Sequence, residues 1–187
     1  MDVIAEALLR REERYCRTQE RRVQTVDEAR AFVERVGFCF LWPIKGIEMP
    51  SLFHAIAGQG AYINQQKLDL SSSAGVDKIT AATIDFKRLP TELACKIVSN
   101  PPYKSQRSFG SVALDWCWFS AERGDVYLHG RQNLWDYAAG LLILQEAGGV
   151  CSTLDGEPVF NGSLETRSAL IGINQTVYDQ WFGFLHR

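Results

Sequence analysis

Hydrophobic positions in this chain follow two periods, the two-residue period of strands and the 3.6-residue period of helices. Short apolar runs bounded by turn residues predict strands at residues 52–57, 61–64, 96–99, 126–129, 150–154 and 169–173. Apolar residues at helical spacing predict helices at residues 111–122 and 134–147, and a last helix that carries Val177, Trp181, Phe184 and Leu185 on one face. We place no element in the mostly polar residues 65–94. Strands that alternate with helices across residues 96–187 predict a layered α/β domain.

The first fifty residues have a different pattern. Residues 2–22 read as a polar helix whose mixed charges favour a solvated surface over a nucleic-acid-binding one. Residues 25–36 read as a helix with a capping box, and residues 38–42 as a buried strand or turn that ends at a proline. The loop-like residues 43–50 are the predicted junction. We therefore expect a helical N-terminal segment, residues 1–50, and a C-terminal domain, residues 51–187.

Charge, apolar stretches and cysteine spacing argue against several classes of protein. The chain has 187 residues and a net charge of −2, so no bulk electrostatic attraction to nucleic acid or to an anionic membrane is expected. The sequence shows no apolar stretch of transmembrane length and no secretory h-region at its start. Its five cysteines form no CxxC pair, which argues against a disulfide framework and a zinc site. A reducing cytoplasm is the expected location.

The most informative single side chain is the carboxylate of Asp136. It stands in the first turn of the predicted helix 134–147, which is otherwise almost wholly apolar. A carboxylate there complements the free backbone N–H groups and the positive end of the helix dipole. The same position could also present an oxygen ligand to a hard cation such as Mg²⁺. The residues alone leave both interpretations open.

Four segments in order resemble the second half of the inositol monophosphatase family. The segment W-D-x-A-A-G, followed by E-A-G-G, is similar to the family's C-terminal signature, and it begins at Trp135. Residues 58–64 resemble the family's G-x-G-A-x-x-N hairpin, residues 107–114 its R-x-x-G-S/T-x-A helix start, and residues 124–127 its next strand entry. The resemblance covers residues 58–187. It implies the second half of an αβαβα sandwich and Mg²⁺-dependent hydrolysis of a small phosphate monoester.

The resemblance also implies roles for individual residues. Asp136 matches a metal ligand of the family. Substrate contacts are assigned to five residues: Gly110, Ser111, Val112, His129 and Trp135. A helix that starts at Ser111 would also offer free N–H donors to an anion, although a plain N-cap remains an alternative. His129 replaces an acidic residue of inositol-preferring members, which puts inositol in doubt as the substrate; a purely structural histidine is the other interpretation.

Two features of the family pattern are missing from this sequence. The family holds its other metal ligands on an acidic helix pair and in a D-P-x-D-G-T loop, and neither motif occurs here. One carboxylate does not hold the metals that activate water for phosphate hydrolysis. We therefore predict weak Mg²⁺ binding and impaired phosphatase activity. The alternative is a non-catalytic family member that acts as a binding module.

Two further expectations concern partners. Residues 25–50 bear a short resemblance to winged-helix proteins related to crosslink-repair DNA glycosylases, which keeps a DNA-associated function as a third, weaker alternative. The helix 134–147 has no polar face and must be covered on nearly all sides. We expect a homodimer on that ground, with a small phosphorylated metabolite as the ligand and no membrane.

Overall fold

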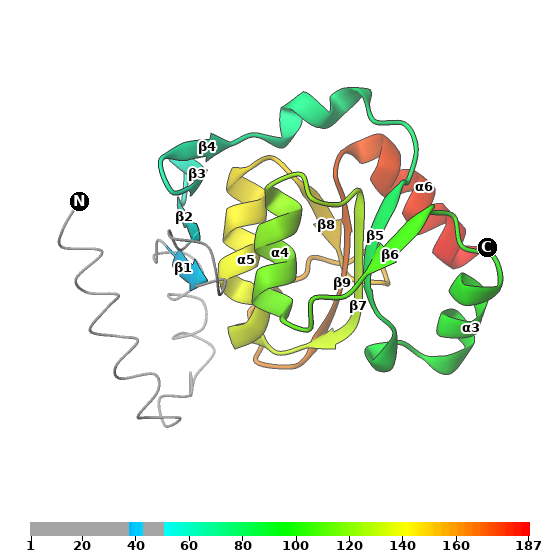
Figure 1. Cartoon of the computed structure of the whole chain (residues 1–187). Helices are drawn as coiled ribbons and strands as arrows, with labels where there is room; N and C mark the ends of the chain where they lie inside the picture. Colours follow the sequence, from blue (N-terminus) through cyan, green and yellow to red (C-terminus); the bar gives the residue numbers. More distant parts are fainter. Residues whose placement is uncertain (1–37, 43–50) are drawn as a thin grey trace.

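The computed structural model describes residues 38–42 and 51–187, which fold into alternating layers of sheet and helix (Figure 1). The first sheet is antiparallel with the order β1-β2-β3-β4. Its strands are β1 (Phe38–Trp42), β2 (Ser51–Ile56), β3 (Gly60–Ile63) and β4 (Gln66–Leu68). The predicted hairpin is thereby confirmed, and the run 38–42 is a strand that pairs with it. The helices predicted at residues 2–22 and 25–36 lie outside the described residues.

The second sheet is mixed, with the order β6-β5-β7-β9-β8. Its strands are β5 (Ala81–Asp85), β6 (Ser105–Arg107), β7 (Val126–Gln132), β8 (Val150–Ser152) and β9 (Arg167–Gly172). Strand β5 runs parallel to both β6 and β7, whereas β9 is antiparallel to β7 and β8. The strands predicted at residues 126–129, 150–154 and 169–173 are confirmed.

Two helices, α4 (Val112–Ser120) and α5 (Leu134–Glu146), lie between the sheets (Figure 1). Helix α5 contacts α4 and strands β1, β2 and β3. Four consecutive apolar side chains of α5, from Leu141 to Leu144, are all buried, which is why this helix needs no polar face. The two helices approach closely at Gly140, where a Cβ atom would lie 2.3 Å from the Cβ of Trp116.

The remaining helices, α3 (Thr91–Ser99) and α6 (Gln175–His186), cover the other face of the mixed sheet (Figure 1). Helix α6 buries Val177, Trp181 and Leu185, and the fourth residue of its predicted face, Phe184, is partly buried against the core. The ammonium group of Lys96 on α3 donates a hydrogen bond to the carbonyl oxygen of Leu185 at 3.1 Å. No helix in the described part of the chain is long and apolar enough to cross a membrane.

The strand predicted at residues 96–99 is wrong. These residues form the last part of α3, which begins after Pro90 and carries Glu92 in its first turn. The two apolar residues of this stretch, Ile97 and Val98, fit a helix as well as a strand, and the helical spacing of Leu93 and Ile97, which both pack in the core, decides the outcome. The unassigned residues 65–94 hold β4, β5 and two 3₁₀ helices, η1 (Leu70–Gly75) and η2 (Phe86–Arg88).

Candidate functional site

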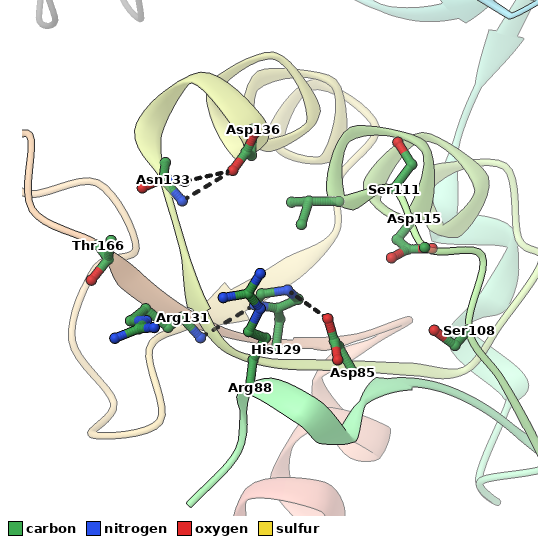
Figure 2. Close-up of a pocket in the computed structure, with 12 residues that line it drawn as sticks. Asp85, Arg88, Ser108, Ser111, Asp115, His129, Arg131, Asn133, Asp136 and Thr166 are labelled. Atoms are coloured by element: carbon green, nitrogen blue, oxygen red, sulfur yellow. Dashed lines mark hydrogen bonds and ion pairs between the residues drawn. The ribbon is translucent and has the colours of Figure 1, made fainter.

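A pocket of about 280 Å³ opens where β5 and β7 end and where α4 and α5 begin (Figure 2). Its wall combines both signs of charge with small polar groups. The lining residues are Asp85, Arg88, Ser108, Gly110, Ser111, Val112, Asp115, His129, Arg131, Asn133, Asp136 and Thr166. The volume is near the lower end of the range for small-molecule sites, which is about 300–1,000 Å³. In open α/β sheets, ligands usually bind at the carboxyl ends of the parallel strands, and this pocket lies at that edge of the mixed sheet.

His129 is held in the pocket wall by two partners. Asp85 and His129 are register neighbours on the parallel strands β5 and β7, and Oδ2 of Asp85 lies 3.3 Å from Nε2 of the imidazole. The backbone N–H of Arg131 donates to Nδ1 at 3.2 Å, so Nδ1 is the acceptor and Nε2 carries the proton. Burial lowers the pKa of His129, against the raising effect of the Asp85 carboxylate. The ring is therefore neutral near pH 7, and neither nitrogen is free to act as a base.

Asp136 caps the helix on which it stands. Its Oδ2 accepts hydrogen bonds from the side-chain amide of Asn133 at 3.0 Å and from the Asn133 backbone N–H at 3.4 Å. The capping interpretation is thus confirmed. The carboxylate also lines the pocket, so a role as a metal ligand remains compatible with its position.

Asp115 on α4 is a buried carboxyl group that the sequence reasoning missed. Its side chain is 6% exposed, and its Oδ1 has no hydrogen-bond partner. Burial raises the pKa of Asp115 to about 7, and the nearby charge of Asp85 adds to this effect. The residue lines the pocket, but the unpartnered Oδ1 is itself buried, so the neutral carboxyl group costs less free energy there than a carboxylate would.

Four of the five substrate-contact residues predicted from the sequence line the pocket. They are Gly110, Ser111, Val112 and His129. Ser111 is also the N-cap of α4, where its hydroxyl accepts from the backbone N–H of Leu114 at 3.5 Å. The fifth residue, Trp135, lies outside the lining and is 54% exposed. The substrate contacts themselves stay predictions.

The donor set does not fit a complete Mg²⁺ site. Asp85, Asp115 and Asp136 share the pocket, but Oδ2 of Asp85 pairs with His129 and Oδ2 of Asp136 with Asn133, while burial favours the neutral form of Asp115. Within residues 38–42 and 51–187, no three His, Cys, Asp or Glu side chains lie close enough to hold one metal ion. Several oxygen ligands are normally required for Mg²⁺.

Comparisons with known proteins point to one family over most of the chain. The model of the inositol monophosphatase family matches residues 43–180. The inositol-1-monophosphatase of Bacillus subtilis is 33% identical over 138 residues, which are 70% of this chain and 51% of that protein. Inositol monophosphatase 1 of Solanum lycopersicum is 37% identical over 105 residues, 53% of this chain and 38% of that protein. The chain thus spans about half the length of the curated relatives it matches.

Solved structures agree in fold. Staphylococcal IMPase-II is 30% identical, with a TM-score of 0.63 over 73% of this chain and 53% of that one. SaIMPase-II with bound inositol monophosphate is 27% identical, with the same TM-score of 0.63 over 83% of this chain and 65% of that one. The observed layers are therefore those of the inositol monophosphatase fold.

Proposed function

Since this chain belongs to the inositol monophosphatase family, we propose that its pocket binds a small phosphate monoester and that its Mg²⁺-dependent hydrolysis is impaired. The observation that carries the proposal is the convergence of the family-type segments at one cavity. The α4 start at Gly110 and Ser111 and the α5 start at Asp136 line the same pocket, although they are far apart in sequence. A helix N-terminus presents backbone N–H donors that suit a phosphoryl group.

Impairment is proposed from the ligand set. Asp136 is the one family-type metal ligand in this sequence, and it is engaged in a cap. Water activation on a phosphate monoester needs metals held by several carboxylates, together with a base that orients the water. The imidazole of His129 does not supply that base because both of its nitrogens have partners. We expect Mg²⁺ binding in the millimolar range or weaker, as for sites with few ligands.

The test measures binding and turnover separately on the full chain. Calorimetric titration with glucose 6-phosphate and inositol 1-phosphate should show binding, while phosphate release from the same esters with and without Mg²⁺ should stay near background. A strong Mg²⁺-dependent rate that Asp136→Ala abolishes would overturn the impairment. Absence of binding to any ester would overturn the proposed function itself.

A non-catalytic binding module is the second candidate function. It is favoured by the state of the three pocket carboxyl groups: Oδ2 of Asp85 and Oδ2 of Asp136 already have partners, and burial favours the neutral form of Asp115. Recognition is then the role left to the pocket. Slow but measurable turnover that depends on Asp136 would favour the enzyme, and binding with no turnover at any Mg²⁺ concentration would favour the module. A DNA-associated function rests on residues 25–50, of which the structure describes 38–42, and these form β1.

Location and assembly stay part of the proposal. A reducing compartment is supported by Cys95, Cys117 and Cys151, which are free cysteines. The homodimer is predicted from the apolar character of α5, but the apolar residues of α5 other than Trp135 are buried within the chain itself. The remaining support for a homodimer is a small set of exposed apolar side chains, which includes Val98 and Phe109. Light scattering should give twice the 21.1 kDa of one chain; a monodisperse monomer would refute the dimer.

A further inference from the structure

A hydrogen bond in the protein interior joins helix α4 to the end of strand β7. The indole N–H of Trp116 on α4 donates to Oε1 of Gln132, the last residue of β7, at 3.1 Å. Both side chains are almost completely buried. A hydrogen bond in such an environment is stronger than in water, and it restricts both the distance and the angle between its two groups. The pair therefore links one helix to one strand end in a defined geometry.

The strand end leads directly into α5. The ladder between β7 and β9 is irregular between His129 and Gln132, and it resumes where Gln132 pairs with Arg167. The next residue, Asn133, is the N-cap of α5, and its backbone and side-chain N–H groups donate to Oδ2 of Asp136 (Figure 2). The place of Gln132 therefore determines where α5 and the Asp136 carboxylate begin.

Trp116 also contacts the other two elements that carry pocket residues. Its ring centroid lies 5.9 Å from that of Tyr127 on β7 and 6.3 Å from that of Tyr137 on α5. On its own helix Trp116 follows Asp115, whose backbone N–H donates to the carbonyl oxygen of the N-cap Ser111 at 2.8 Å. A shift of Trp116 would therefore be transmitted to the start of α4.

Burying the Gln132 amide costs folding free energy. Its Nε2 is buried and has no hydrogen-bond partner within residues 38–42 and 51–187. An apolar side chain of similar length would pack there without that penalty. In some proteins buried polar pairs are retained because they fix one arrangement of the packed elements. Stability alone therefore does not account for this pair.

We propose that Trp116 and Gln132 are positioning residues, whose hydrogen bond holds the starts of α4 and α5 in the arrangement in which both contact one phosphate ester. Neither side chain lines the pocket, so they act through Ser111 and Asp136, which do. The inference rests on the proposed function, since it assumes that the ester binds between these helix starts. It adds two residues that lie outside all four family-type segments.

Matched variants separate positioning from plain stability. Trp116→Phe removes the donor of the bond, and Gln132→Met removes its acceptor while keeping a side chain of similar length. Trp181→Phe is the control, because it makes the same substitution at a fully buried tryptophan of α6 whose indole N–H has no partner in the described part of the chain. Helix α6 lies on the other face of the mixed sheet (Figure 1). Thermal melts show that each variant folds.

The first measurement is the affinity of the full chain for glucose 6-phosphate. We expect Trp116→Phe and Gln132→Met each to bind it about threefold to tenfold more weakly than the parent, the range that one hydrogen bond gives. The double variant should lose no more than the weaker-binding single variant, because both substitutions break the same bond. Trp181→Phe should change only the melting temperature and keep the affinity of the parent.

The second measurement needs no ligand. The backbone N–H groups of Asn133 and Asp136 belong to the α5 cap, since the first donates to Oδ2 of Asp136 and the second to the Asn133 carbonyl oxygen. Hydrogen exchange at these two amides should accelerate in Trp116→Phe and Gln132→Met, relative to exchange in the middle of α5. In Trp181→Phe the ratio of the two rates should stay at that of the parent.

Three results would overturn the inference. Parent-like affinity in the folded Trp116→Phe and Gln132→Met variants would show that the bond positions nothing that the ligand contacts. Equal losses in Trp181→Phe would show a general effect of stability, and additive losses in the double variant would show that the two side chains act separately. If the parent binds no ester, the proposed function fails, and the exchange rates alone then decide whether the bond holds the α5 start: parent-like rates reject it.

Discussion

Nε2 of His129 lies 3.3 Å from Oδ2 of Asp85, its register neighbour on the adjacent parallel strand. The pair is formed by residues 44 positions apart, and it fixes both the tautomer of the imidazole and the orientation of the carboxylate. Both side chains line the pocket (Figure 2).

The Asp85–His129 pair predicts the protonation state of the histidine. Burial lowers the pKa of His129, so the ring should be neutral at pH 7 with its proton on Nε2. In Asp85→Asn the attraction of the carboxylate is lost, so the pKa should fall further. Heteronuclear NMR of the imidazole nitrogens over pH 4–8 measures both. A ring that is charged at pH 7, or a pKa that rises in the variant, would contradict the assignment.

Asp115 predicts a pH dependence of stability. Its pKa is about 7 in the folded protein and about 3.8 in the unfolded chain, so folding is favoured while the group is protonated in both states. Stability is lost as pH rises from about 4 through about 7, by up to about 4 kcal/mol. Asp115→Asn should therefore be clearly more stable than the parent at pH 8, with a smaller difference at pH 4.5.

Urea denaturation at the two pH values measures this effect. The exposed Asp155→Asn is the control, since it removes a carboxylate that has no buried environment, and it should leave the pH profile unchanged. If the stability of the parent and of Asp115→Asn changed equally between the two pH values, the ionisation of Asp115 would cost no folding free energy, which would contradict the prediction.

We expect a glycine-to-alanine substitution to have opposite effects on stability at Gly140 and at Gly183. At Gly140 in α5 a Cβ atom would lie 2.3 Å from the Cβ of Trp116, so Gly140→Ala should destabilise by about 1–3 kcal/mol or more, as for overpacked cores. At Gly183 in α6 a Cβ atom meets nothing within 4 Å, so Gly183→Ala should stabilise by about 0.5–1 kcal/mol. Thermal or urea unfolding compares them directly. A neutral Gly140→Ala would mean that α4 and α5 pack less closely.

Glu146 joins two of the segments that the sequence shows separately. Its two carboxylate oxygens accept from the backbone N–H groups of Gly58 at 2.7 Å and Gly60 at 2.8 Å, so the end of α5 holds the turn of the β2–β3 hairpin. Glu146→Gln should cost about 1–3 kcal/mol, because an amide group would face two N–H donors with one acceptor. Amide exchange at Gly58 and Gly60 should accelerate, whereas the exposed Glu165→Gln should change neither stability nor exchange.

The sequence was most informative where the signals are local and strong. Helix α5 was predicted from an apolar run with a carboxylate in its first turn, and the β2–β3 hairpin from two strands around Gly58 and Gly60. The contact of Glu146 with that turn could not be predicted, because it joins positions more than eighty residues apart. It depends on how the helix packs against the sheet.

The same limit applies to the pocket. Asp85 and Arg88 fall in residues 65–94, where polar composition hides a short buried strand, and their importance arises from the pairing of β5 with β7. Asp115 did leave a signal, as the lone carboxylate in the apolar run of α4, but its burial depends on packing beneath the pocket. The wrong strand at residues 96–99 came from a run too short to separate the two periods.

The central claim is that a small phosphate monoester binds in the pocket between the helix starts and the strand ends. Titration of isotope-labelled full-length chain with glucose 6-phosphate, followed by amide NMR, tests it most directly. The account predicts saturable shifts concentrated at Gly110, Ser111, Asp115, His129 and Arg131, all of which line the pocket. The absence of saturable shifts, or shifts concentrated on α3 and α6 at the other face of the mixed sheet, would contradict it.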